Sequence, residues 1–130
     1  MNIAVSNDNT VIYYDHWEDG YEADITNPKQ STTEIWGDGN PANGYPPGNP
    51  SDLLPAGTVF SLRNLVNSTD GSSVFKYDAR DKIGSFKPIT LTKTCFPAST
   101  NSLLAGCIEV FEHGIWGTEY RAPVGPNMPT

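Results

Sequence analysis

The chain contains few basic residues, with 8 Lys and Arg against 15 Asp and Glu, and its formal net charge is −7. A nucleic-acid-binding protein needs a basic surface to displace counterions from phosphates, so this balance excludes that class. The same balance disfavours binding to anionic membrane surfaces. No apolar run approaches the roughly 18 residues of a membrane span, so we expect no membrane insertion.

Helical patterning is nearly absent from the sequence. No window keeps apolar residues at the i, i+3, i+4, i+7 spacing over three turns, and 12 Gly and 11 Pro interrupt most stretches. Strand patterns separated by turn residues are plentiful instead. The predicted fold class is all-β, an immunoglobulin-like or jelly-roll β-sandwich of about eight short strands with one long Gly/Pro-rich loop. The predicted strands are residues 3–6, 10–17, 30–36, 58–66, 73–77, 88–95, 105–112 and 115–121.

The length of 130 residues corresponds to a single domain, 1–130, which we also consider as a segment of a longer chain. Residues 37–54 contain four Gly and four Pro and show no periodicity. We interpret them as an ordered loop around one end of the sandwich, with a binding or assembly surface as the alternative. Residues 77–83, where Arg80 lies between two Asp, are interpreted as a charged turn between strands.

Catalytic motifs are missing as well. The sequence has neither the Gly-x-Ser-x-Gly elbow of a serine hydrolase nor a Gly-rich phosphate loop before a helix. Its two histidines, His16 and His113, lack metal-ligand spacing to a partner. We therefore expect a protein that is not an enzyme and that needs no cofactor other than a structural Ca²⁺ ion.

The Ca²⁺ expectation comes from residues 15–24, which contain five carboxylates beside the Asp19-Gly20 turn. Hard cations such as Ca²⁺ prefer several oxygen ligands supplied by a flexible loop, and Asp15, Glu18 and Asp19 are the candidate ligands. The spacing differs from that of an EF-hand loop. A solvated acidic turn after a strand and a carboxylate pair for glycosidic cleavage are the alternatives.

Two cysteines, few basic residues and many Asn, Thr, Ser and Gly favour an extracellular or cell-surface protein, although the first residues lack the pattern of a signal peptide. Cys95 and Cys107 lie on predicted neighbouring strands, and their spacing does not match a Cys-x-x-Cys motif. A disulfide between them is predicted, with two buried free thiols as the alternative. Asn67 begins an N-glycosylation sequon at a predicted hairpin tip and is the candidate glycosylation site.

Aromatic residues near acids and turns indicate a second kind of surface. Carbohydrate-binding domains stack sugars on exposed Trp and Tyr rings, and Tyr45, in the Pro-rich loop, is the candidate for such stacking. The alternative for these aromatics is that Trp36 and Trp116 close the core, with their indole N–H groups bonded locally.

The first predicted strand, residues 3–6, is short, apolar and close to the N-terminus. A sandwich has edge strands with unpaired N–H and C=O groups. This strand is therefore expected either to add to the edge of a neighbouring molecule, with Ile3 and Val5 setting the register, or to pair within its own domain.

Several longer motifs carry a resemblance to a known group of proteins. They are Tyr13-Tyr14-Asp15-His16-Trp17-Glu18-Asp19-Gly20-Tyr21-Glu22, Thr33-Glu34-Ile35-Trp36-Gly37-Asp38-Gly39-Asn40, Trp116-Gly117-Thr118 and Ala122-Pro123-Val124-Gly125. Over almost the whole chain the sequence resembles the N-terminal β-rich module of large secreted or surface proteins of bacteria and fungi. That family is distantly similar to IgG-Fc-binding-like surface proteins. The resemblance implies a β module that precedes further β modules, and it assigns no catalytic residue.

We accordingly expect an extracellular structural or adhesive module, a self-assembling subunit of a surface fibre or layer. The expected partners are further copies of the chain or neighbouring β modules, and glycans. The alternative function is that of a carbohydrate-binding or carbohydrate-acting domain.

Overall fold

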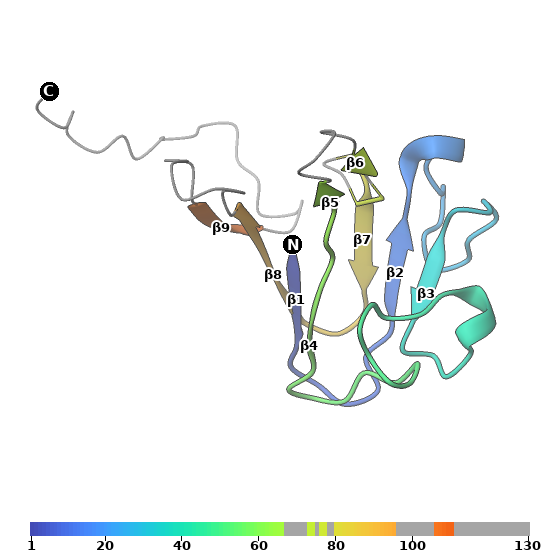
Figure 1. The fold of residues 1–130 in the computed structure, drawn as a ribbon. Helices are drawn as coiled ribbons and strands as arrows, with labels where there is room; N and C mark the ends of the chain where they lie inside the picture. Colours follow the sequence, from blue (N-terminus) through green and yellow to red (C-terminus); the bar gives the residue numbers. More distant parts are fainter. Residues whose placement is uncertain (67–72, 75, 78–79, 96–105, 111–130) are drawn as a thin grey trace, which may run out of the picture.

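The computed structural model describes residues 1–66, 73–74, 76–77, 80–95 and 106–110. They form two antiparallel sheets, a two-stranded ribbon and two single-turn 3-10 helices (Figure 1). The predicted all-β sandwich is confirmed. The elements are β1 (Asn2–Val5), β2 (Ile12–Asp15), η1 (Trp17–Asp19), β3 (Glu34–Trp36), η2 (Pro41–Asn43), β4 (Val59–Ser61), β5 (Leu65–Val66), β6 (Ser73–Val74), β7 (Lys82–Ser85), β8 (Ile89–Cys95) and β9 (Gly106–Val110).

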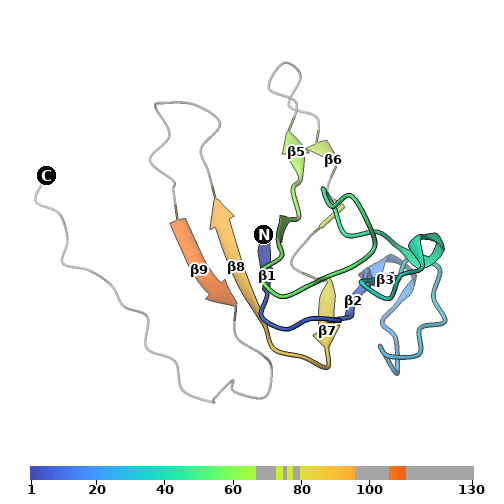
Figure 2. The same ribbon diagram turned by 90° about the horizontal axis from the view of Figure 1, so that it is seen from below.

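The larger sheet has the strand order β4-β1-β8-β9, and the second sheet has the order β3-β2-β7. Viewed from below, β9, β8 and β1 lie on one side of the molecule and β7, β2 and β3 on the other (Figure 2). Every pair of neighbouring strands is antiparallel. The first fifteen residues thus supply an inner strand to each sheet, β1 to the larger one and β2 to the second.

The core lies between the two sheets. Its buried apolar side chains come from both of them: Ile3, Val5, Ile12, Tyr14, Trp36, Leu54, Phe60 and Leu62. Alternate residues of a strand face the same side, which is why Ile3 and Val5, and Ile12 and Tyr14, point inward together. Full burial of an aliphatic or aromatic side chain of this size stabilises a fold by roughly 1.5–3 kcal/mol.

Strand β1 pairs with β4 on one side and with β8 on the other. Ile3 is fully buried and Val5 is nearly so. Of the two predicted arrangements, the structure shows this strand pairing within its own domain. Ile3 and Val5 therefore contribute to the core of the chain itself, and β1 is an inner strand of its sheet.

Three elements differ from the sequence-based expectation. Residues 30–33 do not extend β3, because their N–H and hydroxyl groups bond to acidic side chains of the preceding loop and residues 31–32 form a turn. The predicted strand 58–66 is divided into β4 and β5. Strand β7 lies partly in the predicted charged turn, and it forms because residues 82–85 pair with β2 over four positions.

The predicted hairpin of residues 88–95 and 105–112 is present as β8 and β9. Its register is unbulged and pairs Thr94 with Cys107 and Cys95 with Gly106. The two cysteine positions are thus offset by one residue and are not opposite each other, so the register gives the predicted disulfide no support. The side chains of both cysteines lie outside the described residues, and the disulfide remains a prediction.

Residues 37–54 form an ordered loop held by specific contacts. The backbone N–H of Gly37 donates to Asp52 Oδ1 at 2.6 Å, and Leu54 inserts into the core. Gly44 lies against the outer edge of β3, where a Cβ would come within 2.9 Å of the backbone nitrogen of Ile35. The loop therefore covers the edge of β3, and only glycine at position 44 permits this close approach.

The predicted strand 115–121, His113, Trp116 and the candidate glycosylation site Asn67 lie outside the described residues. None of the helices formed by the residues that are described has the length and apolar character needed to cross a bilayer.

Candidate functional site

The acidic segment after β2 folds back on itself through its own carboxylates. Asp19 follows the turn of η1, and its Oδ2 accepts hydrogen bonds from the N–H groups of Ser31 and Thr32 at 2.9 and 3.2 Å. Its Oδ1 accepts from the Thr32 hydroxyl at 2.6 Å. The Thr32 hydroxyl, aided by the backbone N–H groups, lowers the pKa of Asp19 below its ordinary value of 3.8.

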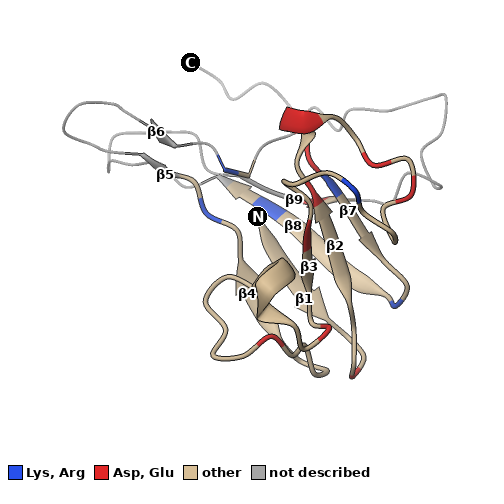
Figure 3. Cartoon of the chain, turned by 90° about the vertical axis from the view of Figure 1, so that its right-hand side faces the viewer, with Lys and Arg blue, Asp and Glu red and all other residues tan. Residues whose placement is uncertain are grey.

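The buried carboxylates of Asp15 and Glu22 also accept hydrogen bonds from this loop. The carboxylate of Asp15 accepts from the Glu22 N–H at 3.0 Å and from the Thr33 hydroxyl at 3.2 Å. Glu22 Oε1 accepts from the N–H groups of Lys29 and Gln30, both at 2.5 Å. Acidic residues thus replace the strand partners that residues 29–33 lack. Figure 3 shows acidic residues, in red, along η1 and the loop that follows it.

The predicted Ca²⁺ ligands are not brought together by this arrangement. Asp15 and Asp19 bond to different parts of the loop, and Glu18 is exposed on η1. Within the part of the chain that the structure describes, the three acidic or histidine side chains whose ligand atoms converge are His16, Glu18 and Asp81, within 4.8 Å of one another. The sequence did not predict this group, because Asp81 lies in the segment before β7, far along the chain from His16 and Glu18.

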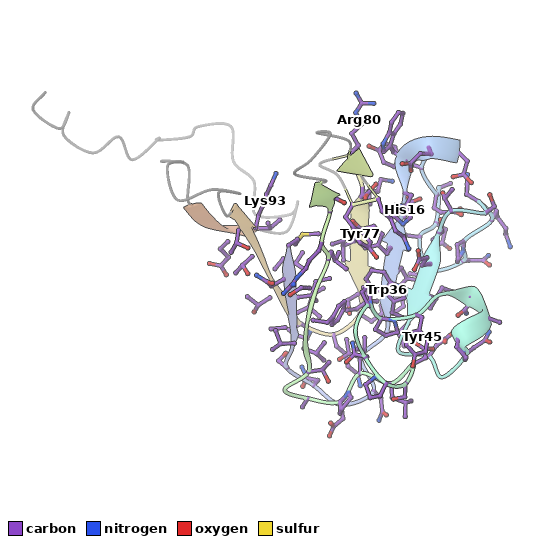
Figure 4. The ribbon with its side chains drawn as sticks, in the orientation of Figure 1. His16, Trp36, Tyr45, Tyr77, Arg80 and Lys93 are labelled. Carbon is purple, nitrogen blue, oxygen red and sulfur yellow. The ribbon has the colours of Figure 1, made fainter. Side chains whose placement is uncertain are left out.

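His16 is the buried member of this group, with 5% of its surface exposed. Its Nδ1 lies 3.5 Å from Asp81 Oδ2, and its Nε2 lies 3.6 Å from Glu34 Oε1. Nε2 has no hydrogen-bond partner among the described residues. The ring packs at 4.8 Å from Tyr14 and at 6.1 Å from Tyr77, between centroids. Figure 4 shows His16, Tyr77 and Trp36 gathered on the side of the molecule formed by β2 and β3, with Lys93 apart on β8.

Polar contacts fix the carboxylates around His16. The Tyr14 hydroxyl donates to Asp81 Oδ2 at 2.8 Å. Glu34 accepts from the indole N–H of Trp36 at 2.8 Å and pairs with the Lys76 ammonium at 2.8 Å. Desolvation acts to raise the pKa of Glu34, but the hydrogen bonds from Lys76 and Trp36 outweigh it, and the pKa lies below its ordinary value.

Two of the exposed aromatic rings, Trp17 and Tyr21, form cation–π contacts with basic side chains of the same chain. The Arg80 guanidinium lies 4.3 Å from the centre of the Trp17 ring, and the Lys82 ammonium lies 4.3 Å from that of Tyr21. These cation–π contacts occupy ring faces that a sugar would need. Tyr45 is 38% exposed, as expected for a ring in the Pro-rich loop, and its role in sugar stacking stays a prediction.

Strand β4 forms one end of the larger sheet, and its inner side is fixed by β1. The Leu62 N–H donates to the carbonyl of Met1 at 2.8 Å, and the Met1 ammonium donates to the Leu62 carbonyl at 2.8 Å. The Val5 N–H donates to the Thr58 carbonyl at 2.9 Å. Residues of an antiparallel strand alternate in the side to which their backbone groups point. Positions 58, 60 and 62 therefore face β1.

By the same alternation, the backbone groups of Val59 and Ser61 point away from β1. No strand pairs with this outer side among the residues that the structure describes. Monomeric proteins protect such an edge with Lys, Pro or a bulge, yet β4 contains neither Lys nor Pro, and Val59 is 65% exposed. Within the described part of the chain, the outer side of β4 is thus an open edge.

A groove of about 680 Å³ runs beside this open edge. Its walls come from β4, from the Pro-rich loop and from the segment before β7: Pro47, Gly48, Val59, Phe60, Ser61, Arg63, Lys76 and Tyr77. Arg63 and Lys76 are both exposed. The groove thus places two cations next to backbone groups that no described strand pairs with, in a chain that is acidic overall.

No protein-family model, curated protein or solved structure gives a significant match to this chain. The resemblance to surface proteins of bacteria and fungi therefore stays a prediction.

Proposed function

We propose that the protein is an extracellular structural module that assembles with further copies of itself by joining sheet edges. The observation that carries the proposal is the geometry of the four-stranded sheet. Its two ends, β4 and β9, run in opposite directions, because three successive antiparallel pairings separate them. A second copy placed beside the first by translation would put its β4 antiparallel to β9.

The register of the sheet specifies how such a joint is made. One row of residues crosses the sheet from Ser61 through Asn2 and Thr92 to Glu109. Side chains of this row already bond to one another, since the Ser61 hydroxyl donates to Asn2 Oδ1 at 2.7 Å. Continuation of the row by translation sets Ser61 of the next copy opposite Glu109.

Backbone alternation makes these two positions complementary. The backbone groups of Ser61 point outward from β4, so alternation along the row makes those of Glu109 point outward from β9. At the joint, Glu109 of one copy and Ser61 of the next would then exchange two N–H to C=O hydrogen bonds. The main chain of the sheet therefore continues across the joint without a change in register.

Charge complementarity favours β9 of a second copy as the occupant of the groove. Glu109 and Arg63 are both exposed, and Arg63 lies two positions beyond Ser61, where continued strand alternation would place it on the same face of the sheet. A diagonal neighbour at this spacing is about 7–8 Å away, within reach of a long side chain. A joint between two different edges is head-to-tail and leaves a free edge at each end, so growth produces an open filament.

The extracellular assignment in this proposal rests on the sequence, through its low content of Lys and Arg, its two cysteines and its sequon at Asn67. The acidic surface would keep the sides of neighbouring filaments apart.

The first test compares Ser61→Pro with Ser61→Ala. Both variants lose the hydroxyl that bonds to Asn2, but only proline removes the outward N–H, and β4 keeps its pairing with β1. Sedimentation velocity over a range of concentrations should show assemblies for the wild type and Ser61→Ala. It should show monomers for Ser61→Pro, with an unchanged circular dichroism spectrum.

A charge exchange tests the identity of the occupant. Arg63→Glu and Glu109→Arg should each weaken assembly, and the double variant should restore it, because the pair is re-formed with reversed signs. A wild-type chain that is monomeric at every concentration, or assembly that Ser61→Pro and the single charge variants leave unchanged, would overturn the proposal.

A further inference from the structure

The convergence of His16, Glu18 and Asp81 calls for an explanation that the loop contacts do not supply. A buried histidine normally satisfies its ring nitrogens, since an unpaired buried polar atom is costly. Only 5% of the surface of His16 is exposed, and its Nε2 forms no hydrogen bond within the described residues. The ring packs between Tyr14 and Tyr77, and its other nitrogen, Nδ1, faces Asp81 Oδ2.

We propose that His16, Glu18 and Asp81 bind a zinc-class divalent cation, with water completing its coordination. Such ions accept one imidazole nitrogen together with carboxylate oxygens. The ligand atoms of the three residues lie within 4.8 Å of one another, and all three flank the same end of β2 and β7.

The distance between His16 Nδ1 and Asp81 Oδ2 supports an ion between them. At 3.5 Å it is long for an N–H to O hydrogen bond, whose usual length is about 2.9 Å. Two ligands of a tetrahedral zinc ion, each about 2.0–2.1 Å from the metal, are about 3.4 Å apart. The observed separation of these two atoms is therefore close to that of two ligands on a tetrahedral zinc ion.

The surroundings of the three residues match those of a metal site. If Nδ1 binds the ion, the proton of His16 resides on Nε2, and the carboxylate on that side is Glu34, whose Oε1 lies 3.6 Å away and is not hydrogen-bonded to Nε2. A carboxylate on this side of the ring commonly accompanies a metal-bound histidine. The Tyr14 hydroxyl orients Asp81 through its 2.8 Å hydrogen bond. Glu34 is itself fixed by Trp36 and Lys76.

The donor set selects zinc-class ions over calcium. Ca²⁺ prefers six to eight oxygen ligands, whereas this group offers one nitrogen and two carboxylates. Asp15 and Asp19, the acids nearest in sequence, are engaged by N–H groups of Glu22, Ser31 and Thr32 and do not join the group.

The test is a titration of the purified full chain with ZnCl₂ alone, followed by calorimetry and by the melting temperature. The wild type should bind one equivalent and melt at a higher temperature with zinc. Glu18→Gln should weaken binding at least tenfold without lowering the melting temperature of the metal-free chain, since Glu18 is exposed. Glu109→Gln, at an exposed glutamate on β9, is the matched control and should bind zinc like the wild type.

A second variant and a spectroscopic measurement complete the test. Asp81→Asn keeps an oxygen for the Tyr14 hydroxyl but removes the charge, and it should weaken binding at least as much as Glu18→Gln. Only two histidines occur in the chain, so zinc should shift the NMR signals of one imidazole, that of His16.

Two outcomes would overturn the proposal. They are no binding at 100-fold excess of zinc over protein, and zinc binding that Glu18→Gln and Asp81→Asn leave intact. Neither bears on the joint between β4 and β9, because Ser61→Pro should bind zinc with the affinity of the wild type.

Discussion

Trp36 meets Phe60 edge-on, with ring centroids 5.6 Å apart and ring planes at 81°, and this contact joins the two sheets of the sandwich. Trp36 is fully buried on β3, and its other face stacks on Tyr14 at 4.9 Å. Edge-to-face pairs contribute about 0.5–1.5 kcal/mol beyond the area that they bury.

Phe60→Leu should therefore lower the free energy of unfolding by about 1–2 kcal/mol, because it removes the ring contact and part of the buried volume. Urea denaturation measures this change. Val59→Thr, the neighbouring exposed and β-branched position, should stay within about 0.5 kcal/mol of the wild type. Equal losses in the two variants would show that Phe60 does not link the sheets.

The alternation of apolar residues was sufficient to predict several strands. Ile3 and Val5, and Ile12 and Tyr14, occupy alternate positions and do face the core, and the hairpin of β8 and β9 has the predicted partners. Such patterns are local, and they depend only on which side of a strand each residue occupies.

The sites could not be predicted in the same way. Tyr14 and Asp81 are 67 residues apart, and they meet because β2 pairs with β7 from Asp15 opposite Lys82. The segment Lys82–Ser85 has a single large apolar residue, Ile83, so its sequence carries no strand pattern. The backbone donors that engage Asp15 and Asp19 are likewise invisible in a sequence, because any residue other than proline can supply them.

Glu22→Ala should expose the loop of residues 24–32 to proteolysis. One oxygen of Glu22 holds the N–H groups of Lys29 and Gln30, and its loss leaves both groups without an acceptor on the loop. Trypsin should then cleave the native protein after Lys29 several times faster than in the wild type. Glu18→Ala is the control, since the exposed Glu18 does not anchor this loop, and equal cleavage rates in both variants would contradict the assignment.

Gly37→Ala should be far more damaging than Gly48→Ala. Both glycines have positive φ, 89° and 76°, and this conformation alone costs a residue with a side chain about 1–2 kcal/mol. At Gly37 a Cβ would also lie 2.4 Å from the carbonyl oxygen of Thr10, whereas at Gly48 nothing lies within 4 Å. Thermal melting should show a clear excess loss in Gly37→Ala, and similar melting temperatures for the two variants would refute a close contact at Gly37.

Asp52→Asn should stabilise the protein at neutral pH and leave it unchanged in acid. Burial, together with the nearby carboxylate of Asp38, raises the pKa of Asp52 above its ordinary value of 3.8, and Oδ2 of Asp52 has no hydrogen-bond donor among the described residues. An acid with a raised pKa binds its proton more tightly when folded, so its favourable contribution is complete below about pH 3.8 and is lost as the pH rises through the folded pKa. Asparagine keeps the oxygen that accepts from the Gly37 N–H and offers an amide N–H to Asp38 without a second charge. The gain in melting temperature over the wild type should therefore be absent at pH 3 and largest at pH 7.

Asp38→Asn is the control with the opposite sign. Despite desolvation, hydrogen bonds from Asn43 and Asn40 hold the pKa of Asp38 below its ordinary value, so loss of this carboxylate should destabilise the protein at pH 7. A gain for Asp52→Asn that is independent of pH would show that the two carboxylates do not share the site as described.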